Sequence, residues 1–100
     1  MQIETSVQEG TVTMALSGRL DTITQEALAD EMETVLQGEK TNLVFDMTSL
    51  DYISSAGLRV LLTAQKKINA QGTSMKIVGA KPEIKEIFDM TGFSSIMTIE

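Results

Sequence analysis

The stretch LVFDMTSLDYISSAGLRVLL, residues 43 to 62, decides the fold because it joins two kinds of hydrophobic pattern. Its first three residues, Leu43 to Phe45, form a short apolar run that ends at Asp46. Such a run is typical of a strand that is covered on both faces. After a loop from Met47 to Tyr52, small polar residues at Ser54 and Ser55 begin a helix. A buried strand followed by a helix indicates an α/β protein.

The predicted helix is apolar over a wide arc. Leu61 and Ile68 lie on one side, Leu58 and Leu62 lie on another, and the helix stops near Gly72. A helix with so broad an apolar surface is expected to be largely enclosed.

A hairpin and a second helix precede this unit. Apolar and polar residues alternate on either side of a turn at Glu9-Gly10, which predicts two paired strands. The segment from Thr22 to Gln25 then has the spacing of a capping box and starts a helix that stops at Gly38. Its expected inner face begins at Ile23 and continues through Ala27, Leu28, Met32, Val35 and Leu36.

The C-terminal third repeats the strand and helix order. Met75 to Val78 predicts a strand, and Lys81-Pro82-Glu83 starts a third helix with proline in its first turn. That helix ends at Gly92, and Ile96 to Ile99 allows a last strand.

The element order predicts one domain over residues 1–100, of α/β (α+β-like) class. The sheet is expected to be mixed, antiparallel at the hairpin and parallel afterwards, with about three to four helices mainly on one face.

Composition narrows the possible functions. Apolar residues make up 42% and charged residues 22%, as in ordinary globular domains. The net charge of -6 and the scattered basic residues disfavour nucleic acid as a partner. The chain starts without a leader pattern and has no apolar run long enough to span a bilayer, so we expect a cytoplasmic protein without direct membrane insertion.

The missing side chains argue against an enzyme. With no histidine and no cysteine, the chain lacks the common general base, the thiolate nucleophile and every ordinary zinc site. Its glycines form no phosphate-binding loop. We therefore expect no catalysis, no metal and no cofactor.

Hydroxyls and carboxylates are predicted to gather at one rim instead. Asp21 follows the second strand, Asp46 ends the third, and Ser54-Ser55 stands at the start of the central helix. In α/β proteins, sites lie at the carboxyl ends of the strands. Ser55 has two interpretations here, a plain helix cap or a chemical switch.

Three segments resemble marker regions of the STAS domain, in particular those of stand-alone bacterial anti-sigma factor antagonists: SGRLD at residues 17 to 21, the stretch at residues 43 to 62, and MKIVGAKPEIKEIFDMTGF at residues 75 to 93. The resemblance covers nearly the whole chain and implies a mixed, mainly four-stranded sheet with helices on one side. It also implies that Ser55 is phosphorylated by an anti-sigma factor that is itself a serine kinase. The unphosphorylated antagonist would bind that kinase and free the sigma factor, and a PP2C-type phosphatase would reverse the modification.

The resemblance also predicts a partner surface and marks two departures. Ser54 replaces an aspartate that many antagonists carry, and Arg59 replaces a glycine. Ser54 is an alternative phosphate acceptor. The expected partner-binding residues are Asp21, Asp46, Ser54, Ser55, Gly57, Leu58, Arg59 and Leu62.

Two other functions stay open on the sequence. The same fold serves as a cytoplasmic accessory subunit of membrane lipid ABC transporters, which a pull-down would reveal. A third interpretation is nucleotide binding by the rim itself, which a thermal shift with ATP or GTP would test.

Overall fold

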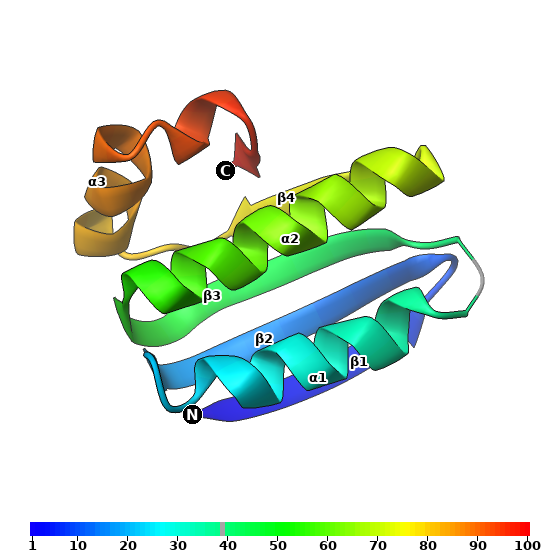
Figure 1. Cartoon of the computed structure of the whole chain (residues 1–100), viewed down its shortest axis with the longest axis horizontal. Coiled ribbons are helices and arrows are strands. Elements are labelled where there is room, and N and C mark those ends of the chain that lie inside the picture. The colour runs from blue at the N-terminus through cyan, green and yellow to red at the C-terminus, as the bar shows by residue number, and fades with distance from the viewer. Residues whose placement is uncertain (39) are drawn as a thin grey trace.

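The computed structural model describes residues 1–38 and 40–100. Its centre is a five-stranded sheet in the order β1-β2-β3-β4-β5, in which β1 is antiparallel to β2 and the remaining neighbours are parallel (Figure 1). The strands are β1 Gln2–Gln8, β2 Thr11–Leu20, β3 Asn42–Ile53, β4 Met75–Val78 and β5 Thr98–Ile99. The mixed sheet and the N-terminal hairpin are thus confirmed, with one short strand more than the mainly four that we expected.

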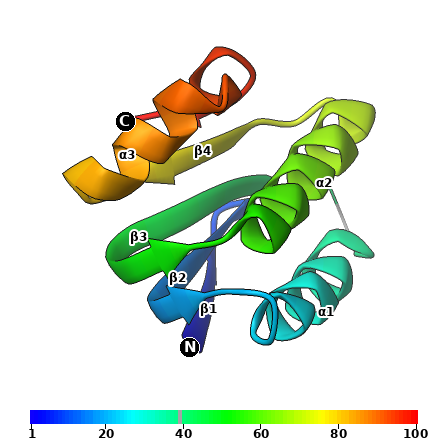
Figure 2. The same ribbon diagram turned by 60° about the vertical axis from the view of Figure 1, so that its left-hand side comes forward.

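Three α-helices and one short 3-10 helix complete the described part of the chain. They are α1 Gln25–Leu36, α2 Ser55–Gln71, α3 Pro82–Met90 and η1 Phe93–Ser95. Helices α1 and α2 lie side by side over the same face of the sheet, whereas α3 stands beyond β4 (Figures 1 and 2). Packing of the two longer helices on one face agrees with the prediction.

The core lies between this helical layer and the sheet. Because strand side chains alternate between faces, every second residue of β2, and of β3 as far as Met47, points to the helices. Figure 2 shows the two layers nearly edge-on. Fully buried members include Met14, Leu16, Leu28, Leu43, Phe45, Met47, Leu61 and Ile68.

The prediction of which residues form the inner face of the first helix is partly wrong. Ile23 is 85% exposed, because it lies in the turn that precedes α1. Ala27 is also exposed, and Ala29 packs against the core instead. The helix begins at Gln25, and its buried face therefore follows Leu28, Met32 and Leu36.

The expected loop from Met47 to Tyr52 is wrong as well, because β3 continues without interruption to Ile53. The register between β2 and β3 shifts twice, and each time β3 carries the extra residue. A bulge inserts one residue and resets which face the following side chains occupy. Each bulge therefore interrupts the alternation of apolar and polar residues in the sequence, although the strand continues.

Candidate functional site

The carboxyl ends of β2 and β3 bring two predicted site segments together. Leu20 and Ile53, the last residues of these strands, are register partners. The backbone N–H of Ser54 donates to the carbonyl of Leu20 at 2.9 Å. Asp21 and the two serines therefore leave the sheet at the same edge, as the sequence predicted.

The two serines have different environments. Ser54 is the N-cap of α2, and its half-buried side chain accepts a hydrogen bond of 3.2 Å from the N–H of Gly57. Ser55 is the first residue of the helix and is exposed. Within the described part of the chain, no hydrogen bond occupies the Ser55 hydroxyl. The capping role thus belongs to Ser54, which leaves Ser55 accessible to another protein.

Asp21 organises the turn between β2 and α1. One carboxylate oxygen accepts the backbone N–H groups of Ile23 and Thr24, both at 3.0 Å, and the Thr24 hydroxyl accepts the N–H of Asp21 at 2.9 Å. The reciprocal box therefore joins Asp21 and Thr24, and the expected pairing of Thr22 with Gln25 is wrong. Arg19 places its Nε 3.8 Å from the other oxygen and its guanidinium 4.1 Å from the Tyr52 ring centre.

These bonds predict a pH dependence. The backbone hydrogen bond from Thr24, with help from its side chain, from Ile23 and from Arg19, holds the pKa of Asp21 below its usual value despite some desolvation. A lowered native pKa stabilises the fold fully above the unfolded pKa, near 4, and this contribution is lost as the pH falls through the native value. In Asp21→Asn, which keeps the acceptor oxygen, the melting temperature should therefore fall less steeply with acidification below about pH 4. Thermal unfolding of both proteins across this range checks the expectation, and parallel curves would contradict it.

Asp46 lies far from this rim. It sits in the middle of β3 between Ala15 and Val78, on the face turned away from the helices. At about 3.3 Å per residue, it is roughly 20 Å along the strand from Ile53. Its carboxylate accepts the Thr48 hydroxyl at 2.7 Å and the Thr48 N–H at 3.0 Å, which lower the pKa of Asp46. The prediction that Asp46 stands beside Ser55 is wrong, because the strand does not end where the apolar run ends.

Two apolar positions of the predicted surface belong to the interior, and a third does so only in part. Gly57 and Leu58 are buried, and Leu62 is half-buried against the core. A Cβ at Gly57 would lie 2.6 Å from Cγ of Leu20 and 3.1 Å from Cγ1 of Ile53. The glycine therefore lets the first turn of α2 lie directly on the sheet. The structure brings together at the surface Asp21, Ser54, Ser55 and Arg59.

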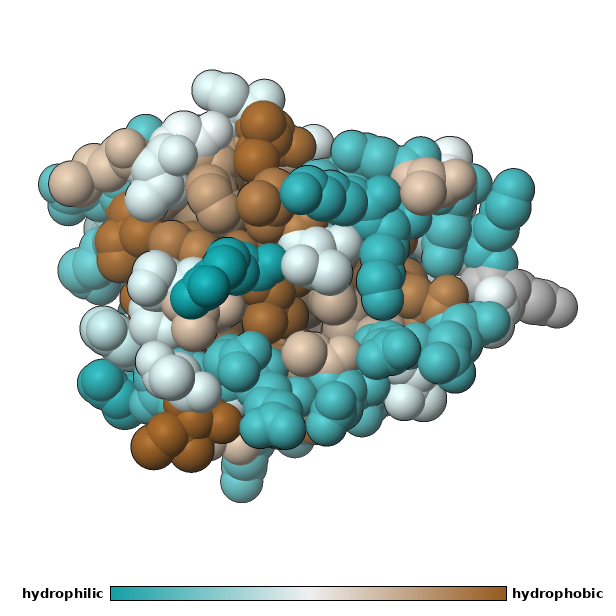
Figure 3. Space-filling view, in the orientation of Figure 1, coloured by the Kyte–Doolittle hydropathy of each residue, from teal (hydrophilic) through white to brown (hydrophobic). Residues whose placement is uncertain are grey.

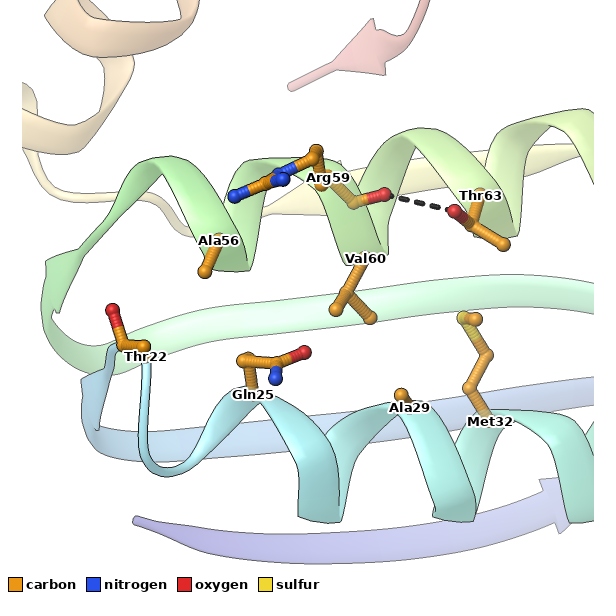
Figure 4. Close-up of a pocket in the computed structure, with 8 residues that line it drawn as sticks. All are labelled: Thr22, Gln25, Ala29, Met32, Ala56, Arg59, Val60 and Thr63. Atoms are coloured by element: carbon orange, nitrogen blue, oxygen red, sulfur yellow. Dashed lines mark hydrogen bonds between the residues drawn. The ribbon is translucent and has the colours of Figure 1, made fainter.

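A groove between α1 and α2 adjoins these residues and was missed by the sequence analysis. Its volume is about 420 Å3, and Ala29, Met32 and Val60 form its apolar part. Figure 3 shows apolar surface between polar side chains on this side of the molecule. Figure 4 shows the lining residues, which are Thr22, Gln25, Ala29, Met32, Ala56, Arg59, Val60 and Thr63. The small side chains Ala29 and Ala56 were the only signal in the sequence that the two helices leave room here.

The chain matches the family model of the STAS domain over residues 2–100. It belongs to the STAS domain family. This STAS domain is 31% identical to the anti-sigma F factor antagonist of Paenibacillus polymyxa, over 99% of this chain and 86% of that protein.

Solved structures show the same fold. The anti-sigma factor antagonist SpoIIAA in its unphosphorylated form superposes with a TM-score of 0.86 at 20% identity, covering 99% of this STAS domain and 88% of that chain. The phosphorylated form of the Bacillus protein SpoIIAA gives a TM-score of 0.77 at 23% identity, covering 99% and 89%.

Proposed function

We propose that this STAS domain is an anti-sigma factor antagonist that binds an anti-sigma factor while Ser55 is unphosphorylated. The observation that carries the proposal is the exposed Ser55 hydroxyl, which no hydrogen bond within the described residues holds, on the first turn of α2. Its relatives are named as anti-sigma factor antagonists, which favours this function over that of an accessory subunit of a transporter. No helix of the described residues has the length and apolar character needed to cross a membrane. We place the proposed exchange of partners in the cytoplasm.

Phosphorylation at Ser55 is the proposed switch. It adds about -1.5 to -2 charges near neutral pH. A helix N-terminus carries partial positive charge, so α2 tolerates the new group and the domain stays folded. A partner docked over Ser55 meets a bulky anion beside the carboxylate of Asp21, which is close to Ser54 and already ionised. The modification therefore opposes docking without requiring a large conformational change.

The partners of this cycle are part of the proposal. The anti-sigma factor is a serine kinase that transfers a phosphoryl group to Ser55, and a PP2C-type phosphatase removes it. Ser54 is the poorer acceptor because its side chain already caps α2 through Gly57, and a phosphate there would replace that hydrogen bond.

Incubation with candidate anti-sigma kinases and ATP, followed by mass spectrometry, tests the site. Wild type and Ser54→Asp are expected to gain one phosphate, because aspartate preserves the cap. Ser55→Ala is expected to lose the label entirely, since it lacks the acceptor oxygen. Undiminished label in Ser55→Ala would refute the assignment. A pull-down that recovers a transporter ATPase and no kinase would favour the accessory subunit.

A further inference from the structure

Arg59 stands one helical turn after Ser55 and has no ion pair within the described residues. Residues four apart on a helix have Cβ atoms about 5–6 Å apart and face the same side. Both side chains are exposed. In Figure 4 the Arg59 side chain extends along α2 toward Ala56, in the direction of the N-terminus of the helix. The guanidinium thus already points to the turn that carries Ser55.

Two other cations near this edge of the sheet already pair with carboxylates. Arg19 pairs with Asp21 and lies over the Tyr52 ring. Lys81, at the start of α3, pairs with Asp51. Within the described residues, Asp21 thus has its own arginine, whereas Arg59 makes no ion pair.

We propose that Arg59 is the internal counter-ion of phosphorylated Ser55, so that the phosphate and the guanidinium form a pair along the first turn of α2. This inference rests on the proposed function, because it concerns the same modification. An arginine fork matches the geometry of phosphate oxygens and donates charge-assisted hydrogen bonds. The pair forms without movement of the backbone, since the two residues already occupy neighbouring turns of one helix.

The pairing gives phosphorylation a second effect on the surface. In the unphosphorylated domain, Arg59 lines the groove between α1 and α2 and makes no ion pair with the described residues. Once the phosphate binds it, the groove loses this cation at the same time as the helix end gains an anion. A partner that meets the guanidinium with a carboxylate then loses that contact as well.

The titration of the phosphate tests this directly. Phosphoserine is placed at position 55 of the full chain by genetic code expansion, so that no kinase is needed, and its second pKa is followed by 31P NMR between about pH 5 and 8. The expected pKa in wild type is about half a unit lower than in Arg59→Gln, because the guanidinium favours the dianion. Arg59→Lys should lie between them, since lysine keeps the charge but not the fork.

Lys67→Gln is the matched control, because it removes one positive charge from the exposed side of α2 far along the helix. Its phosphate should titrate as in wild type. Equal pKa values in wild type and Arg59→Gln would overturn the pairing, and an equal shift in Lys67→Gln would reduce it to a general effect of net charge. Because the phosphate is installed without an enzyme, a failure to find a kinase for Ser55 would leave this result unchanged, and the two failures are distinguishable.

Discussion

Replacing Ser55 with aspartate should weaken binding to the anti-sigma factor by about a hundredfold, which corresponds to roughly 3 kcal/mol. The carboxylate adds a negative charge at the centre of the proposed docking surface, next to the ionised Asp21. An interfacial charge that the partner does not meet costs about 2–5 kcal/mol, and a carboxylate at position 55 that pairs with Arg59 would also withdraw that cation from the partner. Titration calorimetry with an anti-sigma factor that binds the wild-type domain measures the change.

Ser55→Asn is the matched control for charge. Asparagine has nearly the shape of aspartate but no net charge, so this variant should bind within about tenfold of wild type. Neither substitution should lower the melting temperature, because both residues are accepted in the first turn of a helix and aspartate is favoured there. If Ser55→Asp binds as tightly as Ser55→Asn, charge is not what separates the two states.

The order of elements was predictable because each helix and most strands carry their own periodicity. The alternation of β2, the broad apolar arc of α2 and the proline that opens α3 are local patterns, and local patterns are read from the sequence alone. The end of β3 was not predictable in this way. Polar residues such as Thr48 and Ser49 interrupt the apolar run, and only the pairing with β2 shows that they belong to a bulged strand. The misplacement of Asp46 followed directly from that error.

The parts of the site that depend on the order of elements along the chain were predicted correctly. The parts that depend on how side chains and helices pack were not. Asp21 and Ser55 both follow strands, so their common edge follows from topology. Which serine caps α2 and which stays accessible depends on which residue adopts the extended backbone of the N-cap. The sequence is compatible with either serine in that position. The groove beside Arg59 required the spacing of α1 and α2, which no single helix encodes.

Gly57 connects the core to this site, and Gly57→Ala should destabilise the domain by about 2 kcal/mol. The added methyl group would lie 2.6 Å from Cγ of Leu20, which is fully buried. Alanine favours a helix over glycine by about 1 kcal/mol, but overpacking of a dense core costs up to about 3 kcal/mol and is expected to win. For a domain of this size, the melting temperature should fall by about 10 °C.

Whether the melting temperature falls or rises shows which effect is larger, the steric clash with Leu20 or the preference of alanine over glycine in a helix. Gly38→Ala is the control, because a Cβ there would meet nothing within 4 Å. It should leave the melting temperature within a few degrees of wild type or raise it slightly. Gly57→Ala should in addition perturb amide resonances at Ser54 and Ser55, since relief of the clash lifts the first turn of α2 from the sheet. A Gly57→Ala protein that melts at or above the wild-type temperature would show that Leu20 yields, and the position of Ser55 would then not depend on that contact.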